Sequence, residues 1–234
     1  MAGMSAVPIV ALDVPDQPGA IALVDRLGDA CNFFKIGGEL FTATGPVIVE
    51  TLRSRGKRVF LDLKFHDIPN TVRSAARSAA GAGATLITVH GIGGRAMIAA
   101  AVEGAGQNCG VLAVTVLTSL DESSLSQALG KAVSVSDEVS RIATIAREAG
   151  AHGVVCSGQE AARIAAENGK NLAILVPGVR LAGDSAHDQS RVVRPADAVK
   201  AGATYLVLGR TVTAASDPAA ALARVLDEIA LAAA

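Results

Sequence analysis

The sequence feature that most constrains the fold is an Ala-Gly-Ala tripeptide that occurs three times, each time just before a short apolar run. The three pairs are Ala82-Gly83-Ala84 before Leu86 to Val89, Ala149-Gly150-Ala151 before Gly153 to Cys156, and Ala201-Gly202-Ala203 before Tyr205 to Leu208. Each tripeptide closes a stretch of helical composition, and glycine is the usual residue after the last turn of a helix. The repeat therefore predicts the same helix-to-strand join at three points of the chain.

Five further apolar runs raise the number of predicted strands to eight: Val7 to Leu12, Cys31 to Ile36, Val59 to Leu63, Val111 to Val116 and Leu172 to Val176. Helical composition lies between most of the strands and after the last one, over residues 19–27, 40–55, 70–80, 95–102, 136–149, 159–167, 195–200 and 218–232. Continuous apolar strands are typical of a parallel sheet that is covered on both faces.

Eight strand–helix units in 234 residues favour an α/β fold, a single (β/α)8 TIM barrel, over the second possibility of a doubly wound open sheet. No Pro/Gly/Ser linker or charge block divides the chain, so we expect one TIM-barrel domain over residues 1–234.

Composition excludes several classes of protein. The net charge of -1 provides no general field that would attract nucleic acid or an acidic membrane surface, so any bound anion needs a local site. The apolar runs are far shorter than the roughly 20 residues of a membrane span, and residues 1–12 lack a signal-peptide pattern. The three cysteines are an odd number and lie far apart, which favours neither a disulfide framework nor a zinc site. We expect a cytoplasmic protein.

Polar residues gather where the predicted strands end, which in a barrel is the mouth that carries function. The third strand runs through Asp62 and Lys64 into Asp67, and Lys35 lies at the end of the second strand. Side chains two apart on a strand share a face, so Asp62 and Lys64 are expected to point into the same mouth. A single such pair would be read as a surface ion pair, but two lysines and two aspartates together predict a charge-balanced site.

A second cluster lies after the seventh and eighth predicted strands, where barrels often bind phosphate. Gly178 and Gly209 allow the backbone to approach a ligand closely, and Arg180 and Arg210 supply forked donors that suit a phosphate. The polar stretch 181–191 between them has the composition of a lid. His66 and His90 also lie near strand ends, but neither has a second His at metal-ligand spacing, so no metal site is predicted.

The segment Asp62 to Thr71 resembles the D-x-K-x-x-D-I-P-N-T signature of the orotidine 5'-phosphate decarboxylase family, specifically its shorter bacterial type. Six further segments at strand ends match that family: residues 11–13, 34–37, 114–119, 177–180, 188–189 and 208–210. The resemblance thus runs along most of the chain.

The resemblance implies decarboxylation of orotidine 5'-monophosphate to uridine 5'-monophosphate and CO2, the last step of de novo pyrimidine biosynthesis, without a metal or an organic cofactor. It also implies a homodimer with shared active sites. By position, Lys64 would protonate C6 of the pyrimidine, with Asp62, Lys35 and the partner subunit's Asp67 completing the charged array. The other implied binding residues are Asp13 on the ribose, Ile68 and Thr71 across the dimer interface, Thr118 beside the base, and Arg180, Gln189, Gly209 and Arg210 on the phosphate.

Two alternatives remain open at this point. The first is a metal-dependent sugar-phosphate decarboxylase or aldolase of the same barrel superfamily, which would have an acidic magnesium ligand near the position of Lys35. The second is a non-catalytic barrel that binds phosphoribosyl groups, which could keep both arginines but would have no need for Asp62 and Lys64.

Overall fold

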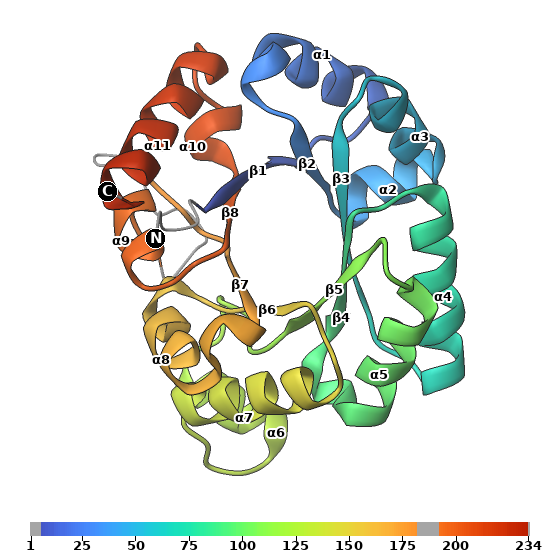
Figure 1. The fold of residues 1–234 in the computed structure, drawn as a ribbon, viewed down its shortest axis with the longest axis vertical. Coiled ribbons are helices and arrows are strands. Elements are labelled where there is room, and N and C mark those ends of the chain that lie inside the picture. The colour runs from blue at the N-terminus through green and yellow to red at the C-terminus, as the bar shows by residue number, and fades with distance from the viewer. Residues whose placement is uncertain (1–5, 182–191, 234) are drawn as a thin grey trace.

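The computed structural model describes residues 6–181 and 192–233, and in it eight parallel strands form a closed barrel in sequence order (Figure 1). The strands are β1 (Val7–Leu12), β2 (Phe33–Ile36), β3 (Arg58–Phe65), β4 (Leu86–His90), β5 (Gly110–Val114), β6 (Gly153–Val155), β7 (Ala173–Val176) and β8 (Tyr205–Leu208). Because β8 pairs with β1 through Val7 and Tyr205, the sheet has no free edge. The predicted TIM barrel is confirmed and the open sheet is excluded.

Helices form a ring around the barrel, as Figure 1 shows. They are α1 (Gln17–Leu27), α2 (Gly38–Thr44), α3 (Val47–Ser54), α4 (Pro69–Ala82), α5 (Gly94–Ala105), α6 (Glu122–Leu129), α7 (Val135–Glu148), α8 (Gly158–Asn168), α9 (Pro195–Lys200), α10 (Arg210–Thr213) and α11 (Pro218–Ala233). Short 3₁₀ turns lie at Gly28–Ala30, Gly91–Gly93 and Gly169–Asn171. In the part of the chain that the structure describes, no helix is long and apolar enough to cross a bilayer.

The repeated tripeptide does form the same join three times. Helix α4 ends at the first residue of the tripeptide, Ala82, and α7 and α9 end just before it. The central glycines Gly83, Gly150 and Gly202 have φ angles of 97°, 79° and 94°. These angles lie in the left-handed region that glycine adopts without steric cost, which explains why a glycine stands at each position.

One helix prediction is corrected. The stretch 40–55 is not a single helix but two, α2 and α3, which are separated at Gly45 and Pro46. Gly45 has a φ of 63°, and Pro46 has no backbone N–H to continue the helical hydrogen bonds of α2. The connection 119–136, for which no element was predicted, contains the short helix α6.

The core has two layers. Side chains that alternate along the strands fill the barrel interior: Ile9, Ala11, Phe33, Phe60, Leu86, Leu112, Leu175, Tyr205 and Val207. Their neighbours on the same strands, such as Val10 and Leu12, point outward and pack beneath the helices. The opening at the centre of the ribbon view is therefore a packed interior, as expected for this architecture.

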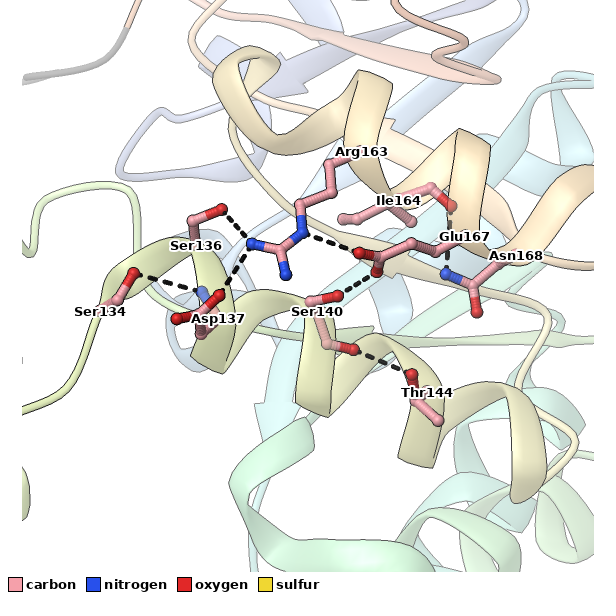
Figure 2. A network of polar contacts seen from close by, with 9 residues as sticks. All are labelled: Ser134, Ser136, Asp137, Ser140, Thr144, Arg163, Ile164, Glu167 and Asn168. Atoms are coloured by element: carbon pink, nitrogen blue, oxygen red, sulfur yellow. Dashed lines mark hydrogen bonds and ion pairs between the residues drawn. The ribbon is translucent and has the colours of Figure 1, made fainter.

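A network of polar side chains joins α7 and α8 on the outside of the barrel (Figure 2). Arg163 of α8 contacts Asp137 and Ser136 of α7 at 2.9 and 2.8 Å, and Glu167 of its own helix at 2.7 Å. Ser140 of α7 donates a hydrogen bond to Glu167. The hydrogen bond from the Ser140 hydroxyl, followed by that from Arg163, holds the pKa of the Glu167 carboxyl below its usual range. These groups are solvent-exposed, so the network orients two neighbouring helices and adds little stability.

Candidate active site

A cavity of about 490 Å³ opens at the carboxyl ends of the strands. Nine of the residues singled out in the sequence line it: Asp13, Lys35, Asp62, Lys64, Thr118, Gly178, Arg180, Gly209 and Arg210. They come from loops and strands that are far apart in the sequence, and closure of the barrel brings them to one mouth. The lining also includes apolar side chains that the sequence reasoning missed, namely Ala11, Phe60, Val114, Val116, Leu117, Val155, Leu175 and Val207. Alternation along the strands is the signal that could have identified most of them.

The charged groups form a connected row in this cavity. The Nζ atom of Lys64 lies 2.9 Å from Oδ1 of Asp62, and Nζ of Lys35 lies 3.8 Å from Oδ2 of the same carboxylate. Lys35 also donates a hydrogen bond of 2.9 Å to Asp13. With only 9% of its surface exposed, Lys35 needs this compensation, because an unpaired buried ammonium is costly. The row therefore runs from Asp13 through Lys35 and Asp62 to Lys64.

Lys64 reaches this position through an irregularity in β3. The pairing of β3 with β4 joins Leu61 to Ile87 and then Phe65 to Val89, so extra residues of β3 lie opposite Thr88 alone. Such a bulge re-aims side chains, and Lys64 has a φ of 50°, the one positive φ of a non-glycine residue among the described residues. Asp62 and Lys64 both line the cavity, as the strand period predicted, although the strand between them is not regular.

The opposite wall of the cavity carries the two arginines. Arg180 follows β7 and is largely buried, and its guanidinium donates to the Val179 carbonyl at 2.9 Å. Arg210 is exposed at the start of α10, directly after Gly209. A bridge between Val179 and Val193 joins the two ends of the segment that contains the expected lid. Gln189, His187 and residues 182–191 of that lid lie outside the described residues.

Asp67, Ile68 and Thr71 are not in the lining of this cavity. Asp67 accepts a 2.6 Å hydrogen bond from the Ile68 backbone N–H, just before α4, and Ile68 is 67% exposed. All three residues are exposed at the rim of the barrel. The single chain thus does not bring them to its own charged row.

Two histidines lie beside the row. The rings of His66 and His90 have centroids 5.6 Å apart, and burial, followed by the nearby His66 and Lys64, lowers the pKa of His90. His152 lies at the other end of the barrel, where its ring contacts the Tyr205 hydroxyl at 3.0 Å. Within residues 6–181 and 192–233, no group of three His, Cys, Asp or Glu side chains is arranged to hold a metal ion.

Comparison with known proteins identifies a family that matches most of this chain. Residues 7–225 match the model of the "Orotidine 5'-phosphate decarboxylase / HUMPS family". An orotidine 5'-phosphate decarboxylase of Alkalilimnicola ehrlichii is 50% identical over 225 residues, which cover 95% of this chain and 95% of that protein. One from Moorella thermoacetica is 47% identical over 229 residues, or 94% and 91% of the two chains.

Solved structures give the same result. The crystal structure of orotidine 5'-phosphate decarboxylase from Lactobacillus acidophilus superposes with a TM-score of 0.86 at 34% identity, and the match covers 96% of this chain and 99% of that one. At this level of identity the similarity extends beyond the barrel architecture.

Proposed function

Because the chain belongs to the orotidine 5'-phosphate decarboxylase / HUMPS family, we infer that it is a carbon–carbon lyase that converts orotidine 5'-monophosphate into uridine 5'-monophosphate and CO2. This reaction is the last step of UMP biosynthesis. The observation that carries the assignment to the barrel mouth is the Lys35–Asp62–Lys64 row, which lies in the same cavity as Arg180 and Arg210. A non-catalytic barrel that only binds phosphoribosyl groups would not need this row of charged side chains.

We assign the proton transfer to Lys64. When the bond between C6 and the carboxyl carbon breaks, CO2 leaves and the electron pair stays on C6, which has no adjacent electron sink. A fixed ammonium interacts more strongly with this localised charge than with the delocalised carboxylate, and so stabilises the transition state more than the ground state. Nζ of Lys64 then gives one proton to C6, and solvent returns a proton to the amine.

Asp62 holds Lys64 in place through the 2.9 Å contact, and Lys35 compensates the second oxygen of the same carboxylate. Asp62 is also proposed to lie close to the substrate carboxylate, where repulsion raises the energy of the bound ground state. Lys35 and Asp13, which are joined by a 2.9 Å hydrogen bond, are proposed to hold the ribose hydroxyls.

The phosphate is proposed to lie against Arg180, Gly209 and Arg210, with Gln189 from the segment outside the described residues. A bound phosphate supplies binding energy remote from the reacting carbon, which holds the base in register during the reaction. Thr118, at the rim of the same cavity, is proposed to contact the pyrimidine. No step in this scheme needs a metal or an organic cofactor.

We propose that the active unit is a homodimer with shared sites. Asp67, Ile68 and Thr71 are exposed and lie outside the cavity of their own chain, which supports a role in the cavity of a second copy. The half-buried to exposed apolar side chains Ile68, Ile92 and Leu117 follow three successive strands at the same rim and would be covered in such a dimer. The three cysteines are buried and form no disulfide, which suits a reducing compartment and supports a cytoplasmic enzyme.

The test is to follow the ultraviolet absorbance of orotidine 5'-monophosphate incubated with the purified protein, with and without excess chelator. Conversion of the spectrum to that of uridine 5'-monophosphate at the same rate in both samples is expected. Loss of activity with chelator would favour a metal-dependent lyase of the superfamily instead. An unchanged spectrum together with tight binding of the nucleotide would show a non-catalytic binder.

A further inference from the structure

Thr88 lies in the middle of β4, directly opposite the bulge of β3. Its side chain has no exposed surface, although it carries a hydroxyl, and it is absent from the cavity lining. A buried hydroxyl needs hydrogen-bond partners, and those of Thr88 are both in the charged row.

The hydroxyl connects two parts of that row. Oγ1 of Thr88 donates to Oδ1 of Asp62 at 2.9 Å and accepts a hydrogen bond from the backbone N–H of Lys64, also at 2.9 Å. The carboxylate oxygen that Thr88 contacts is the same Oδ1 that receives Nζ of Lys64. One hydroxyl therefore fixes both the carboxylate and the backbone of the lysine that pairs with it.

The backbone contact matters because Lys64 has a φ of 50°. A residue with a Cβ rarely adopts this conformation, which persists only where surrounding contacts hold it. The bulge removes the regular strand pairing at this point, and the Thr88 hydroxyl supplies the acceptor that a backbone carbonyl would supply in a regular ladder.

We propose that Thr88 is a positioning residue for the decarboxylation: its hydroxyl holds Lys64 in the left-handed conformation and locks Asp62 against it, so that Nζ is aimed at the reacting carbon. The proposal rests on the function proposed above. Thr88 does not touch the substrate and acts only through Asp62 and Lys64. The arginines lie on the opposite wall of the cavity, so loss of the hydroxyl affects the chemical step and leaves phosphate binding unchanged.

The experiment compares Thr88→Val, which keeps the branched shape but removes the hydroxyl, with Thr88→Ser, which keeps the hydroxyl. Thr88→Val is expected to lower kcat by about tenfold to a hundredfold with KM for orotidine 5'-monophosphate within about twofold of wild type. Thr88→Ser is expected to keep kcat within about threefold of wild type, which is the rescue that a role in packing alone does not predict.

Thr204→Val is the matched control. The Thr204 hydroxyl also accepts a backbone N–H, that of Ile174 at 3.2 Å, but it lies just before β8 at the other end of the barrel. The Thr204→Val variant is expected to have a lower melting temperature and an unchanged kcat. A merely structural role for Thr88 predicts the same behaviour for Thr88→Val, so a lower melting temperature with wild-type kcat would overturn the proposal.

A crystal structure of Thr88→Val provides a readout that does not depend on activity. We expect Lys64 to leave the positive-φ region and the contact between Nζ and Asp62 to lengthen. If both features persist, the positioning role is wrong whatever the rate. If the wild-type protein does not decarboxylate orotidine 5'-monophosphate, the proposed function is wrong instead, and the geometry of the variant still decides the role of Thr88.

Discussion

At the scale of single residues, the barrel mouth depends on charges that compensate one another. Asp62 contacts both Lys35 and Lys64, so each ammonium has a carboxylate partner. This mutual compensation explains how a lysine as buried as Lys35 is tolerated. It also means that a substitution in the row leaves a partner uncompensated, so its effect includes more than the loss of one group.

Lys64→Ala is expected to lower kcat by at least about a thousandfold, because the variant lacks both the proton donor and the charge that stabilises the carbanion. The measurement is the rate of absorbance change with orotidine 5'-monophosphate in the presence of chelator. Circular dichroism should show that the variant remains folded.

Lys57→Ala is the control for that variant. Lys57 precedes β3 at the other end of the barrel, where Nζ donates to the carbonyls of Gly28 and Cys31. This variant is expected to lose stability but to turn over at the wild-type rate. Substantial residual activity in Lys64→Ala would exclude Lys64 as the proton donor.

His90 predicts how stability depends on pH. In the folded protein, burial lowers the pKa of His90 below its ordinary value of 6.5. As the pH falls through this ordinary value, the unfolded chain therefore takes up a proton before the folded chain does. The contribution of His90 to stability is therefore complete above the unfolded pKa and is lost as the pH falls through it. Urea unfolding of wild type at about pH 7.5 and about pH 5.5 should show lower stability at the acidic pH, and His90→Gln should show a smaller difference. Equal differences in the two proteins would contradict this account.

At the scale of elements, close packing of α4 on α5 depends on a glycine. A Cβ placed on Gly104 of α5 would lie 2.1 Å from the carbonyl oxygen of Arg73 in α4, which cannot move aside as a side chain could. In α4, Gly81 has open space around its Cβ position. The close packing of the two helices therefore requires a glycine at position 104, whereas it does not require one at position 81.

Gly104→Ala is expected to lower the free energy of unfolding by about 1–3 kcal/mol, because the two helices are forced apart. Gly81→Ala is expected to raise it by up to about 1 kcal/mol, since alanine has the higher helix propensity and meets no neighbour. Chemical unfolding of both variants beside wild type measures the two effects. A stabilising Gly104→Ala would show that α4 and α5 separate at little cost.

The elements also show where sequence reasoning succeeds. Strands were predicted nearly to their observed ends, since a buried parallel strand requires an unbroken apolar run. The pair α2 and α3 was predicted as one helix because the helical composition is continuous except at Gly45 and Pro46. These two residues are where the helices separate. The four-residue helix α10 was missed because a helix that short leaves no periodic pattern.

At the scale of the whole molecule, the proposed dimer makes a prediction of its own. If each site takes Lys64 from one subunit and Asp67 from the other, Lys64→Ala and Asp67→Ala homodimers are both impaired at every site. A heterodimer of the two variants contains one site with both wild-type residues. Mixing equal amounts under conditions of subunit exchange should therefore restore up to about one quarter of the wild-type activity. No gain on mixing, with exchange verified, would contradict shared sites.

We also propose that residues 1–234 form one domain, which predicts a single unfolding transition. Tyr205, the only tyrosine in a chain without tryptophan, lies in the barrel interior and reports on that core by fluorescence. Circular dichroism reports mainly on the outer helices. The two transitions should coincide in denaturant, whereas separate midpoints would indicate that parts of the chain unfold independently.

The sequence by itself determined the barrel, the end of the barrel where the charged residues gather, and the family. Each of these depends on local information, because apolar runs, glycine stops and the Asp62–Thr71 segment are readable without knowing what they contact. Only the tertiary structure decided which charges touch, since the row from Asp13 to Lys64 joins the ends of three neighbouring strands, β1, β2 and β3, through their pairing in the sheet. Only the tertiary structure also revealed the left-handed backbone conformation of Lys64 and the hydrogen bond from its N–H to Thr88. A bulge depends on the register between two strands, and the sequence of one strand does not determine that register.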